Sequence, residues 1–200
     1  QATDYQVPVT VAGKSAKKIR YGLEKQKFDY EDFKNLEIPL AGKHQIDNAV
    51  LALEVVNALQ KKGYSITEKA IRTGLKETEW RGRFTLLSKK PYFVVDGAHN
   101  EDAAKKLAES IEFYFTNKRI IYIMGILRDK EYERIIELTH TYADQILAVS
   151  TPNQARTLSS YELATEVAKL HPNVTAVESL EEAVELAYLL AGKEDVIIAF

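Results

Sequence analysis

From Phe84 onwards, short apolar runs alternate along the chain with longer amphipathic stretches. Apolar runs rich in Val, Ile, Phe and Tyr are typical of strands, and apolar residues three and four positions apart are typical of helices. The pattern predicts strands at Phe84–Leu87, Tyr92–Val95, Ile120–Met124, Gln145–Val149, Val174–Val177 and Asp195–Phe200, and helices at Asp102–Phe115, Lys130–Tyr142, Ser160–Leu170 and Leu180–Leu190. Because strands and helices alternate, we expect an α/β fold with a mostly parallel sheet and helices on both of its faces.

The first eighty residues predict a different arrangement. Strands are expected at Val7–Val11, Ile19–Leu23 and Asn35–Leu40, with the second pairing back on the first. Helices are expected at Gln45–Lys62 and from Ser65 or Thr67 to Glu77, with Thr67 as a suitable N-cap. We therefore place a domain boundary near Trp80–Arg83, which divides residues 1–79 from residues 80–200.

Composition narrows the class of protein. The chain has 200 residues with 27 Lys and Arg against 29 Asp and Glu, so its net charge of −2 gives no electrostatic reason to expect nucleic acid or a membrane as a partner. The absence of cysteine excludes disulfides and thiolate chemistry. No apolar run is long enough to span a bilayer. The chain begins at Gln1 and stops at Phe200 within an apolar run, so we expect a fragment of a longer protein.

Gly13-Lys14-Ser15 resembles the end of a phosphate-binding P-loop. The full pattern requires a second glycine five residues before Gly13, and that position is Pro8. Proline has no backbone N–H with which to hold a phosphate. We therefore interpret this stretch as a hairpin turn with exposed lysines.

The stretch from Asp96 to Asn100 (Asp-Gly-Ala-His-Asn) runs from a predicted strand end through a turn into a predicted helix. Asp96 is expected at the carboxyl edge of the sheet, where a carboxylate can accept hydrogen bonds from ribose hydroxyls. Gly97 permits a backbone conformation closed to other residues, and Asn100 is a suitable helix cap. His99 is expected to project into the same crevice. The alternative is a structural turn in which Asp96 and Asn100 satisfy local backbone groups, and the pattern favours neither interpretation.

A second polar cluster lies at the predicted start of the helix from Gln45. Gln45 and Asn48 are three residues apart and share a helix face with His44 nearby. Their amides can both donate and accept hydrogen bonds, which suits an adenine edge. Taken alone, capping and a buried polar contact are the simpler interpretation.

Arg83, at the proposed boundary, could hold a phosphate with its guanidinium fork, although solvated arginines are common. His140 and His171 are interpreted as surface or helix-end residues. No spacing of histidine and carboxylate indicates a metal site.

Taken in order, these segments resemble the Mur ligase superfamily and, within it, the folylpolyglutamate synthases. Those enzymes share a Gly-x-His-Gln-x-x-Asn-Ala helix start, a Trp-Pro-Gly-Arg linker and an Asp-Gly-Ala-His-Asn turn. The matching segments here are Gly42–Ala49, Trp80–Arg83 and Asp96–Asn100. Two later segments of the family also have counterparts: Gly125 with Asp129-Lys130 resembles its Gly-x-x-x-Asp-Lys segment, and Arg156 resembles the arginine of its Pro-Arg-Ala segment. Arg81 replaces the linker proline, Glu101 stands where proline commonly follows the turn, and Ala155 stands where proline often precedes the arginine.

The resemblance implies a Rossmann-like C-terminal domain preceded by the end of a central ATPase domain. It implies a cytoplasmic ligase, monomeric as the full-length enzyme, that joins L-glutamate to tetrahydrofolate through an acyl phosphate and uses ATP and Mg²⁺. By motif, Gln45 and Asn48 would contact adenine, Arg83 the phosphates, Asp96 the ribose, and His99 the incoming glutamate or the phosphate that it displaces. The family's P-loop, magnesium ligands and modified lysine would lie upstream of Gln1.

Two other functions stay open from the sequence. One is a muramyl-peptide ligase of the same superfamily, against which His44-Gln45 and the Asp96–Asn100 turn both argue. The other is a non-catalytic nucleotide-binding module, because a fold does not fix a function.

Overall fold

The structure is a computed structural model, and it describes Val9 and residues 15–152 and 156–200. Contacts divide the chain into two compact units, Gln1–Glu79 and Trp80–Phe200. The predicted strand at residues 7–11 and the turn at Gly13-Lys14 lie, except for Val9, outside the described residues.

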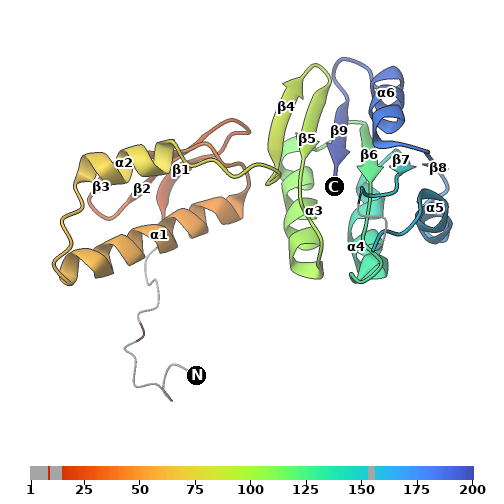
Figure 1. Cartoon of the computed structure of the whole chain (residues 1–200). Helices are drawn as coiled ribbons and strands as arrows, with labels where there is room; N and C mark the ends of the chain where they lie inside the picture. The colour runs from red at the N-terminus through yellow and green to blue at the C-terminus, as the bar shows by residue number, and fades with distance from the viewer. Residues whose placement is uncertain (1–8, 10–14, 153–155) are drawn as a thin grey trace. The chain divides into compact units, whose positions relative to one another are not determined.

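Three described strands of the first unit form an antiparallel sheet in the order β1-β2-β3 (Figure 1). They are β1 (Lys17–Arg20), β2 (Gln26–Tyr30) and β3 (Phe33–Ile38). Phe28 and Tyr30 of β2 and Leu36 and Ile38 of β3 are buried, and the residues between them are more polar. This alternation places one face of the sheet in the core.

Two helices cover the buried face of this sheet: α1 (Lys43–Lys61) and α2 (Glu68–Lys76). Their apolar side chains form one core cluster with those of the sheet, contributed by Ile46, Ala49, Val50, Leu53 and Ile71. Both helices match the predicted ones to within a few residues. Thr67 is the N-cap of α2, as predicted, and its hydroxyl accepts a hydrogen bond from the backbone N–H of Ala70.

The pairing of β1 was not predicted. β1 pairs with β2 in antiparallel fashion, and β2 itself was missed by the sequence interpretation. Gly22 makes the connection possible, because a Cβ atom at this position would lie only 2.6 Å from the carbonyl oxygen of Lys25. The chain therefore turns back at Gly22 and forms a meander with the two strands that follow.

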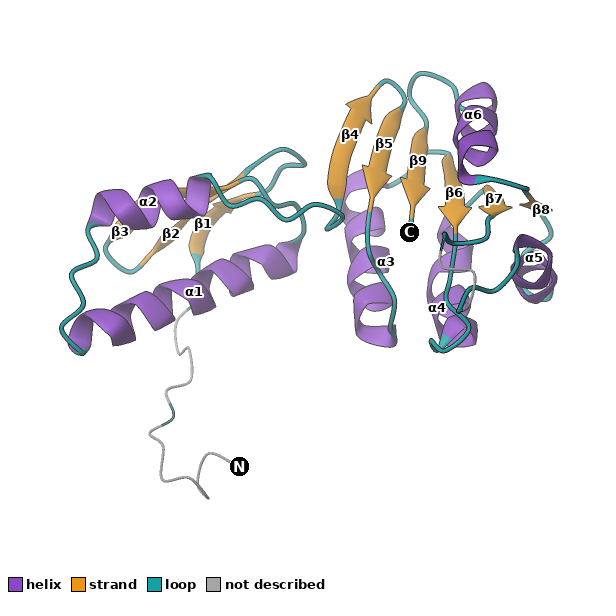
Figure 2. Cartoon of the chain, in the orientation of Figure 1, coloured by secondary structure: helices purple, strands orange, loops and turns teal. Residues whose placement is uncertain are grey.

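Six described strands of the second unit form a single sheet in the order β4-β5-β9-β6-β7-β8 (Figure 2). They are β4 (Thr85–Lys89), β5 (Tyr92–Val95), β6 (Ile120–Met124), β7 (Gln145–Ala148), β8 (Val174–Ala176) and β9 (Val196–Ala199). All neighbouring pairs are parallel except β4 and β5, which are antiparallel. The prediction of a mostly parallel sheet is therefore confirmed.

Helices cover both faces of this sheet, as predicted. They are α3 (Glu101–Phe115), α4 (Tyr132–Thr139), α5 (Ser160–Ala168) and α6 (Leu180–Leu190). Figures 1 and 2 show α3 and α4 side by side against one face and α6 against the other. Tyr122 of β6 faces α4 and donates its hydroxyl hydrogen to the carbonyl oxygen of Thr139, whereas Ile121 and Ile123 join a core cluster with Ala183 and Ala187 of α6.

The start of α5 carries a reciprocal cap. The Ser159 hydroxyl accepts from the backbone N–H of Glu162 at 3.2 Å, and the Glu162 carboxylate accepts from the backbone N–H of Ser159 at 3.0 Å. The Arg128 guanidinium adds two hydrogen bonds to the same carboxylate, at 2.9 and 2.8 Å. Arg128 first, and then Ser159, lower the pKa of Glu162 to about 2.

We predict that the Glu162 carboxylate titrates near pH 2 in the folded protein, and that Arg128→Met raises its pKa toward the ordinary value of 4.5. Because the folded pKa is the lower one, these contacts stabilise the fold fully above about pH 4.5, and the contribution is lost as the pH falls toward 2. An NMR titration of the carboxyl carbons measures this directly, with Lys130→Met as the control in the same loop. A midpoint near 4.5 in the unaltered protein would contradict the prediction.

His140 and His171 both lie at helix ends, which is one of the two predicted placements. His171 is also buried, with only 8% of its surface exposed, and the sequence did not indicate this burial. Its Nε2 atom lies 2.9 Å from the carbonyl oxygen of Ala143, so this nitrogen carries the hydrogen. Because the partner is distant in sequence, the local pattern around His171 gave no sign of burial.

Candidate active site

The turn from Asp96 to Asn100 follows directly after β5, at the carboxyl end of that strand. In a parallel sheet this edge is where ligands bind. Asn100 is the N-cap of α3, and its side-chain oxygen accepts from the backbone N–H of Ala103 at 2.9 Å. The turn therefore joins a buried central strand to a capped helix, which holds both of its ends in place.

Asp96 has a structural partner within the second unit. Its Oδ2 atom accepts a hydrogen bond of 2.8 Å from the backbone N–H of Phe84. This bond ties the end of β5 to the segment that leads into β4. Asp96 is half-buried and lines a largely apolar cavity of about 190 Å³ at the carboxyl ends of β5, β6, β7 and β9. Asp96 thus satisfies a nearby backbone group, as the structural interpretation of the turn predicts, and the ribose-binding role stays a prediction.

Glycine is required at position 97 because a side chain there would be too close to neighbouring atoms, and not because of the backbone angle φ. Its φ lies outside the left-handed region, which corrects the expectation from the sequence. A Cβ atom at this position would lie 3.2 Å from the carbonyl oxygen of Gly82 and 3.3 Å from a guanidinium nitrogen of Arg83. The glycine that does adopt a left-handed φ here is Gly82, at 72°. Glycine at position 97 lets the Arg83 segment lie directly against the turn.

Arg83 and His99 meet at one backbone atom. The carbonyl oxygen of Gly97 accepts a hydrogen bond from Arg83 Nη1 at 3.1 Å and lies 2.7 Å from His99 Nδ1. A carbonyl oxygen can only accept, so His99 carries its hydrogen on Nδ1, and Nε2 is the acceptor when the ring is neutral. The structure therefore brings Asp96 and His99, which belong to the turn, together with Arg83, which contacts the turn from the loop before β4.

Other contacts that hold Arg83 were not found from the sequence. The Thr85 hydroxyl accepts from the backbone N–H groups of Gly82 and Arg83 at 3.0 and 3.3 Å. The Arg83 guanidinium lies 5.4 Å from the ring centre of Trp80, a distance typical of a cation–π contact. The sequence signal was the closeness of Trp80, Arg83 and Thr85 along the chain, but only the fold shows that they share one loop.

The other two predicted site residues lie in the first unit, at the start of α1. Gln45 is buried, with 5% of its surface exposed, and Asn48 is exposed. Asn48 Nδ2 donates a hydrogen bond of 3.0 Å to Gln45 Oε1. The buried Gln45 and the exposed Asn48 thus form one polar pair at the start of α1, on the shared helix face that their three-residue spacing predicted.

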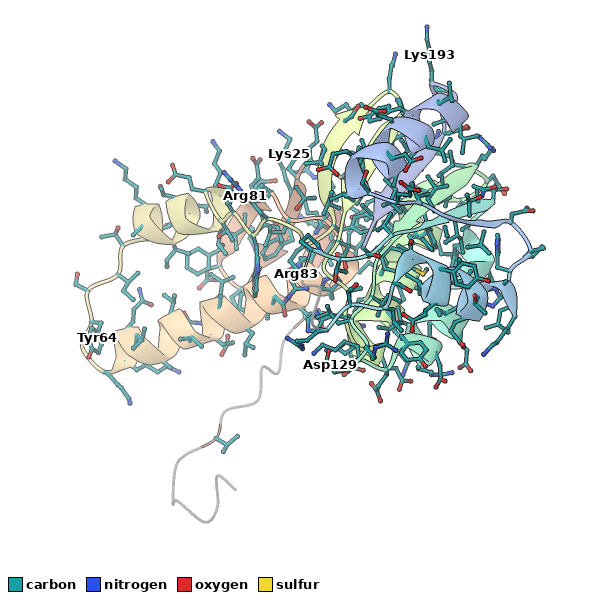
Figure 3. The ribbon with its side chains drawn as sticks, turned by 45° about the vertical axis from the view of Figure 1, so that its right-hand side comes forward. Lys25, Tyr64, Arg81, Arg83, Asp129 and Lys193 are labelled. Carbon is teal, nitrogen blue, oxygen red and sulfur yellow. The ribbon has the colours of Figure 1, made fainter. Side chains whose placement is uncertain are left out.

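Two later segments of the second unit also meet. Asp129 lies in the loop after β6 (Figure 3), and its carboxylate accepts a hydrogen bond from the Arg156 guanidinium. This contact lowers the pKa of the Asp129 carboxyl below its usual range. Both residues belong to segments singled out from the sequence, but their pairing was not predicted.

Within the described parts of the chain, no group of three or more His, Asp or Glu residues converges on a point that could hold a metal ion. Among the same residues, no helix is long and apolar enough to cross a membrane.

Comparison with known proteins gives relatives in one group of enzymes. The dihydrofolate synthase/folylpolyglutamate synthase of Bacillus subtilis is 37% identical over 118 residues, which are 58% of this chain and 27% of that protein. The folylpolyglutamate synthase of Lacticaseibacillus casei is 32% identical over 138 residues, which are 66% of this chain and 32% of that protein. The chain therefore matches only part of each relative.

A solved structure supports the fold. The Mycobacterium tuberculosis folylpolyglutamate synthase complexed with ADP and AMPPCP aligns with 99% of this chain and 48% of its own, with a TM-score of 0.84 and 22% identity. Residues 82–200 also match the profile of the Mur ligase, glutamate ligase domain. That match covers more than half of the sequence, and the chain belongs to the Mur ligase family through this domain.

Proposed function

We propose that this chain is the adenosine- and glutamate-binding part of an ATP-dependent ligase that adds L-glutamate to tetrahydrofolate. The observation that carries the proposal is the turn after β5, where Asp96, Arg83 and His99 are held around Gly97 at the carboxyl edge of a parallel sheet. The names of the relatives support folate as the substrate class.

The proposed reaction has two steps. A terminal carboxylate oxygen of the folate attacks the γ-phosphorus of ATP, and ADP leaves, so an acyl phosphate forms. The amine of glutamate then attacks the acyl carbon, loses a proton, and displaces inorganic phosphate to leave an amide. The acyl phosphate is open to hydrolysis, so an enzyme of this kind must exclude water from it.

Asp96 and Arg83 are proposed to hold the nucleotide. A carboxylate has about four lone-pair sites, so the bond that Asp96 accepts from Phe84 is compatible with further bonds from ribose hydroxyls. The Arg83 guanidinium is fixed by Gly97 and lies by Trp80, which leaves a planar fork oriented before a phosphate arrives. Such preorganised donors stabilise charge that develops during phosphoryl transfer.

His99 is proposed to position the incoming glutamate or the phosphate that it displaces. The bond from Nδ1 to the Gly97 carbonyl fixes the ring, so Nε2 is the atom available for the reaction. A neutral Nε2 can accept a proton from the glutamate amine, and a protonated one can donate to a carboxylate or phosphate oxygen.

Gln45 and Asn48 are proposed to contact the adenine base. Their side chains are already joined by a hydrogen bond, so their orientations are partly set before the base binds. Amide groups in this arrangement can offer both a donor and an acceptor to the edge of an adenine.

Magnesium is part of the proposed reaction, but none of the described side chains is assigned to it, because none of them forms a suitable cluster. A cytoplasmic location and a monomeric complete enzyme belong to the same proposal and rest on the family resemblance.

The test is ADP release by the complete protein that contains this chain, supplied with ATP, magnesium and L-glutamate. We expect release to depend on a reduced folate and not on a muramyl peptide, with none from the 200-residue chain alone. No release with folate would overturn the proposal. ADP release with the muramyl substrate would support a ligase of the same superfamily that acts on a different class of substrate.

A further inference from the structure

Gln26 is the most deeply buried polar side chain near the proposed adenine contacts. It is the first residue of β2, and none of its surface is exposed. Its Nε2 atom donates to the carbonyl oxygens of Leu40 at 2.6 Å and Gly42 at 2.9 Å. These two bonds fix which way the amide lies, because both partners are acceptors. Burying an amide costs free energy unless it is hydrogen-bonded, so these two bonds offset part of that cost, while the buried Oε1 atom of Gln26 has no hydrogen-bond partner among the described residues.

The carbonyl groups that Gln26 holds belong to the segment immediately before α1. Gly42 is the N-cap residue of that helix, with a φ of 104° that side chains rarely adopt, and no side chain caps the helix at this position. The Gly42 carbonyl also accepts from the backbone N–H of Gln45 at 3.1 Å. Gln26 therefore acts from a neighbouring strand on the atom that begins the first turn of α1.

A continuous series of hydrogen bonds runs from Gln26 to the proposed base contacts. Gln26 binds the Gly42 carbonyl, this carbonyl binds the backbone of Gln45, and the Gln45 side chain binds Asn48. All four residues belong to the first unit, and Gln26 itself is too buried to touch a ligand.

We propose that Gln26 is a positioning residue that sets the first turn of α1 and, through it, the Gln45–Asn48 pair for adenine. The inference rests on the proposed role of that pair. It assigns to a side chain on β2 control over nucleotide affinity and over the choice between adenine and other bases. A displacement of about 1 Å in a binding site can cost up to about a hundredfold in efficiency, so loss of the two bonds has a measurable effect.

The test compares Gln26→Met with Gln60→Met in the complete protein. Methionine has nearly the volume of glutamine but cannot donate a hydrogen bond. Gln60 is a matched control, because its Nε2 atom also donates a hydrogen bond to a backbone carbonyl, that of Ile66 at 2.7 Å. It lies at the C-terminal end of α1, far from the first turn that Gln26 contacts. We expect Gln26→Met to raise the Michaelis constant for ATP about tenfold with little change in kcat, and to weaken the preference for ATP over GTP. Gln60→Met should leave both unchanged.

Asn48→Ala separates the inference from the function on which it rests. If Asn48→Ala raises the Michaelis constant for ATP and Gln26→Met does not, Gln26 is only structural and the inference is overturned while the adenine pair stands. If neither variant changes it, the adenine role fails and the inference fails with it. If Gln26→Met does not fold, Gln26→Asn keeps the amide but is too short to reach both carbonyls, and it should shift the constant in the same direction.

Discussion

Replacing Arg83 with methionine is expected to lower the kcat of the complete protein by about 100- to 1,000-fold, the usual loss when one preorganised donor to a developing negative charge is removed. Arg83 is held by its bond to the Gly97 carbonyl and by its contact with Trp80, so its guanidinium is placed before the nucleotide binds. A residue placed in this way contributes more to the transition state than to substrate binding, and kcat should therefore fall more than the Michaelis constant for ATP rises.

The matched control is Arg72→Met. Arg72 also donates a guanidinium hydrogen to a backbone carbonyl, that of Lys34 at 2.9 Å, but it lies on α2 and pairs with Glu68. We expect its replacement to leave kcat unchanged. Arg83→Lys should recover only part of the activity, because lysine keeps the charge and loses the planar fork. An unaltered kcat in Arg83→Met would show that Arg83 only fastens the loop.

The fold of the second unit was predictable because its four central strands, β5, β6, β7 and β9, are largely buried on both faces. Ile120–Met124 is a continuous apolar run with Gly125 after it. Because it lies between amphipathic helices, a buried strand of a parallel sheet is the simplest interpretation. What the pattern could not give is the order of the strands. β9 lies between β5 and β6, although it comes last in the chain. That placement depends on which helix covers which face, and therefore on contacts between distant segments.

The first unit was less predictable for a related reason. β2 reads Gln-Lys-Phe-Asp-Tyr, and its inward positions include the polar Gln26 beside Phe28 and Tyr30. A hydrophobic pattern that contains a buried glutamine is weak over so short a strand. The alternation of Phe28 and Tyr30 with Lys27 and Asp29 was nonetheless a usable signal, and so was the matching alternation in β3.

The residues that the sequence singled out divide into those with local contacts, which were predicted, and those with contacts to distant segments, which were not. Asn100 and Thr67 act as helix caps, as their sequence positions predicted, because a cap depends on residues only three positions away. The meeting of Arg83 with Gly97 and the pairing of Asp129 with Arg156 span longer separations. Such contacts follow from the fold, and no local pattern contains them.

Replacing Asp96 with alanine is expected to raise the Michaelis constant for ATP in the complete protein by about 10- to 100-fold. A hydrogen bond to a charged group contributes about 1.5–3 kcal/mol, and about 1.4 kcal/mol corresponds to a factor of ten. Alanine, however, also removes the acceptor that Phe84 N–H uses in the structure. A raised constant in Asp96→Ala alone would therefore mix a local disturbance of the turn with the loss of a ribose contact.

Asp96→Asn separates these two effects. An asparagine side chain keeps an oxygen that can accept from the Phe84 N–H, but it carries no charge to strengthen bonds from hydroxyl groups. We expect the melting temperature of this variant to be close to that of the unaltered protein, and its affinity for ATP to be lower. A matched control for the loss of one surface carboxylate is Asp102→Asn, which lies in the first turn of α3 and is expected to change neither property.

The ribose assignment itself is tested by removing the hydroxyls from the nucleotide. If Asp96 accepts from a ribose hydroxyl, the unaltered protein should favour ATP over either the 2′-deoxy or the 3′-deoxy analogue. In Asp96→Asn that preference should shrink. Removing the hydroxyl and removing the charge of Asp96 both weaken the same interaction, so their effects are not additive. If the preference is instead equal in both proteins, the ribose hydroxyls do not bind Asp96. Its carboxylate would then serve to join the end of β5 to Phe84, and the nucleotide would be held through other groups on the turn.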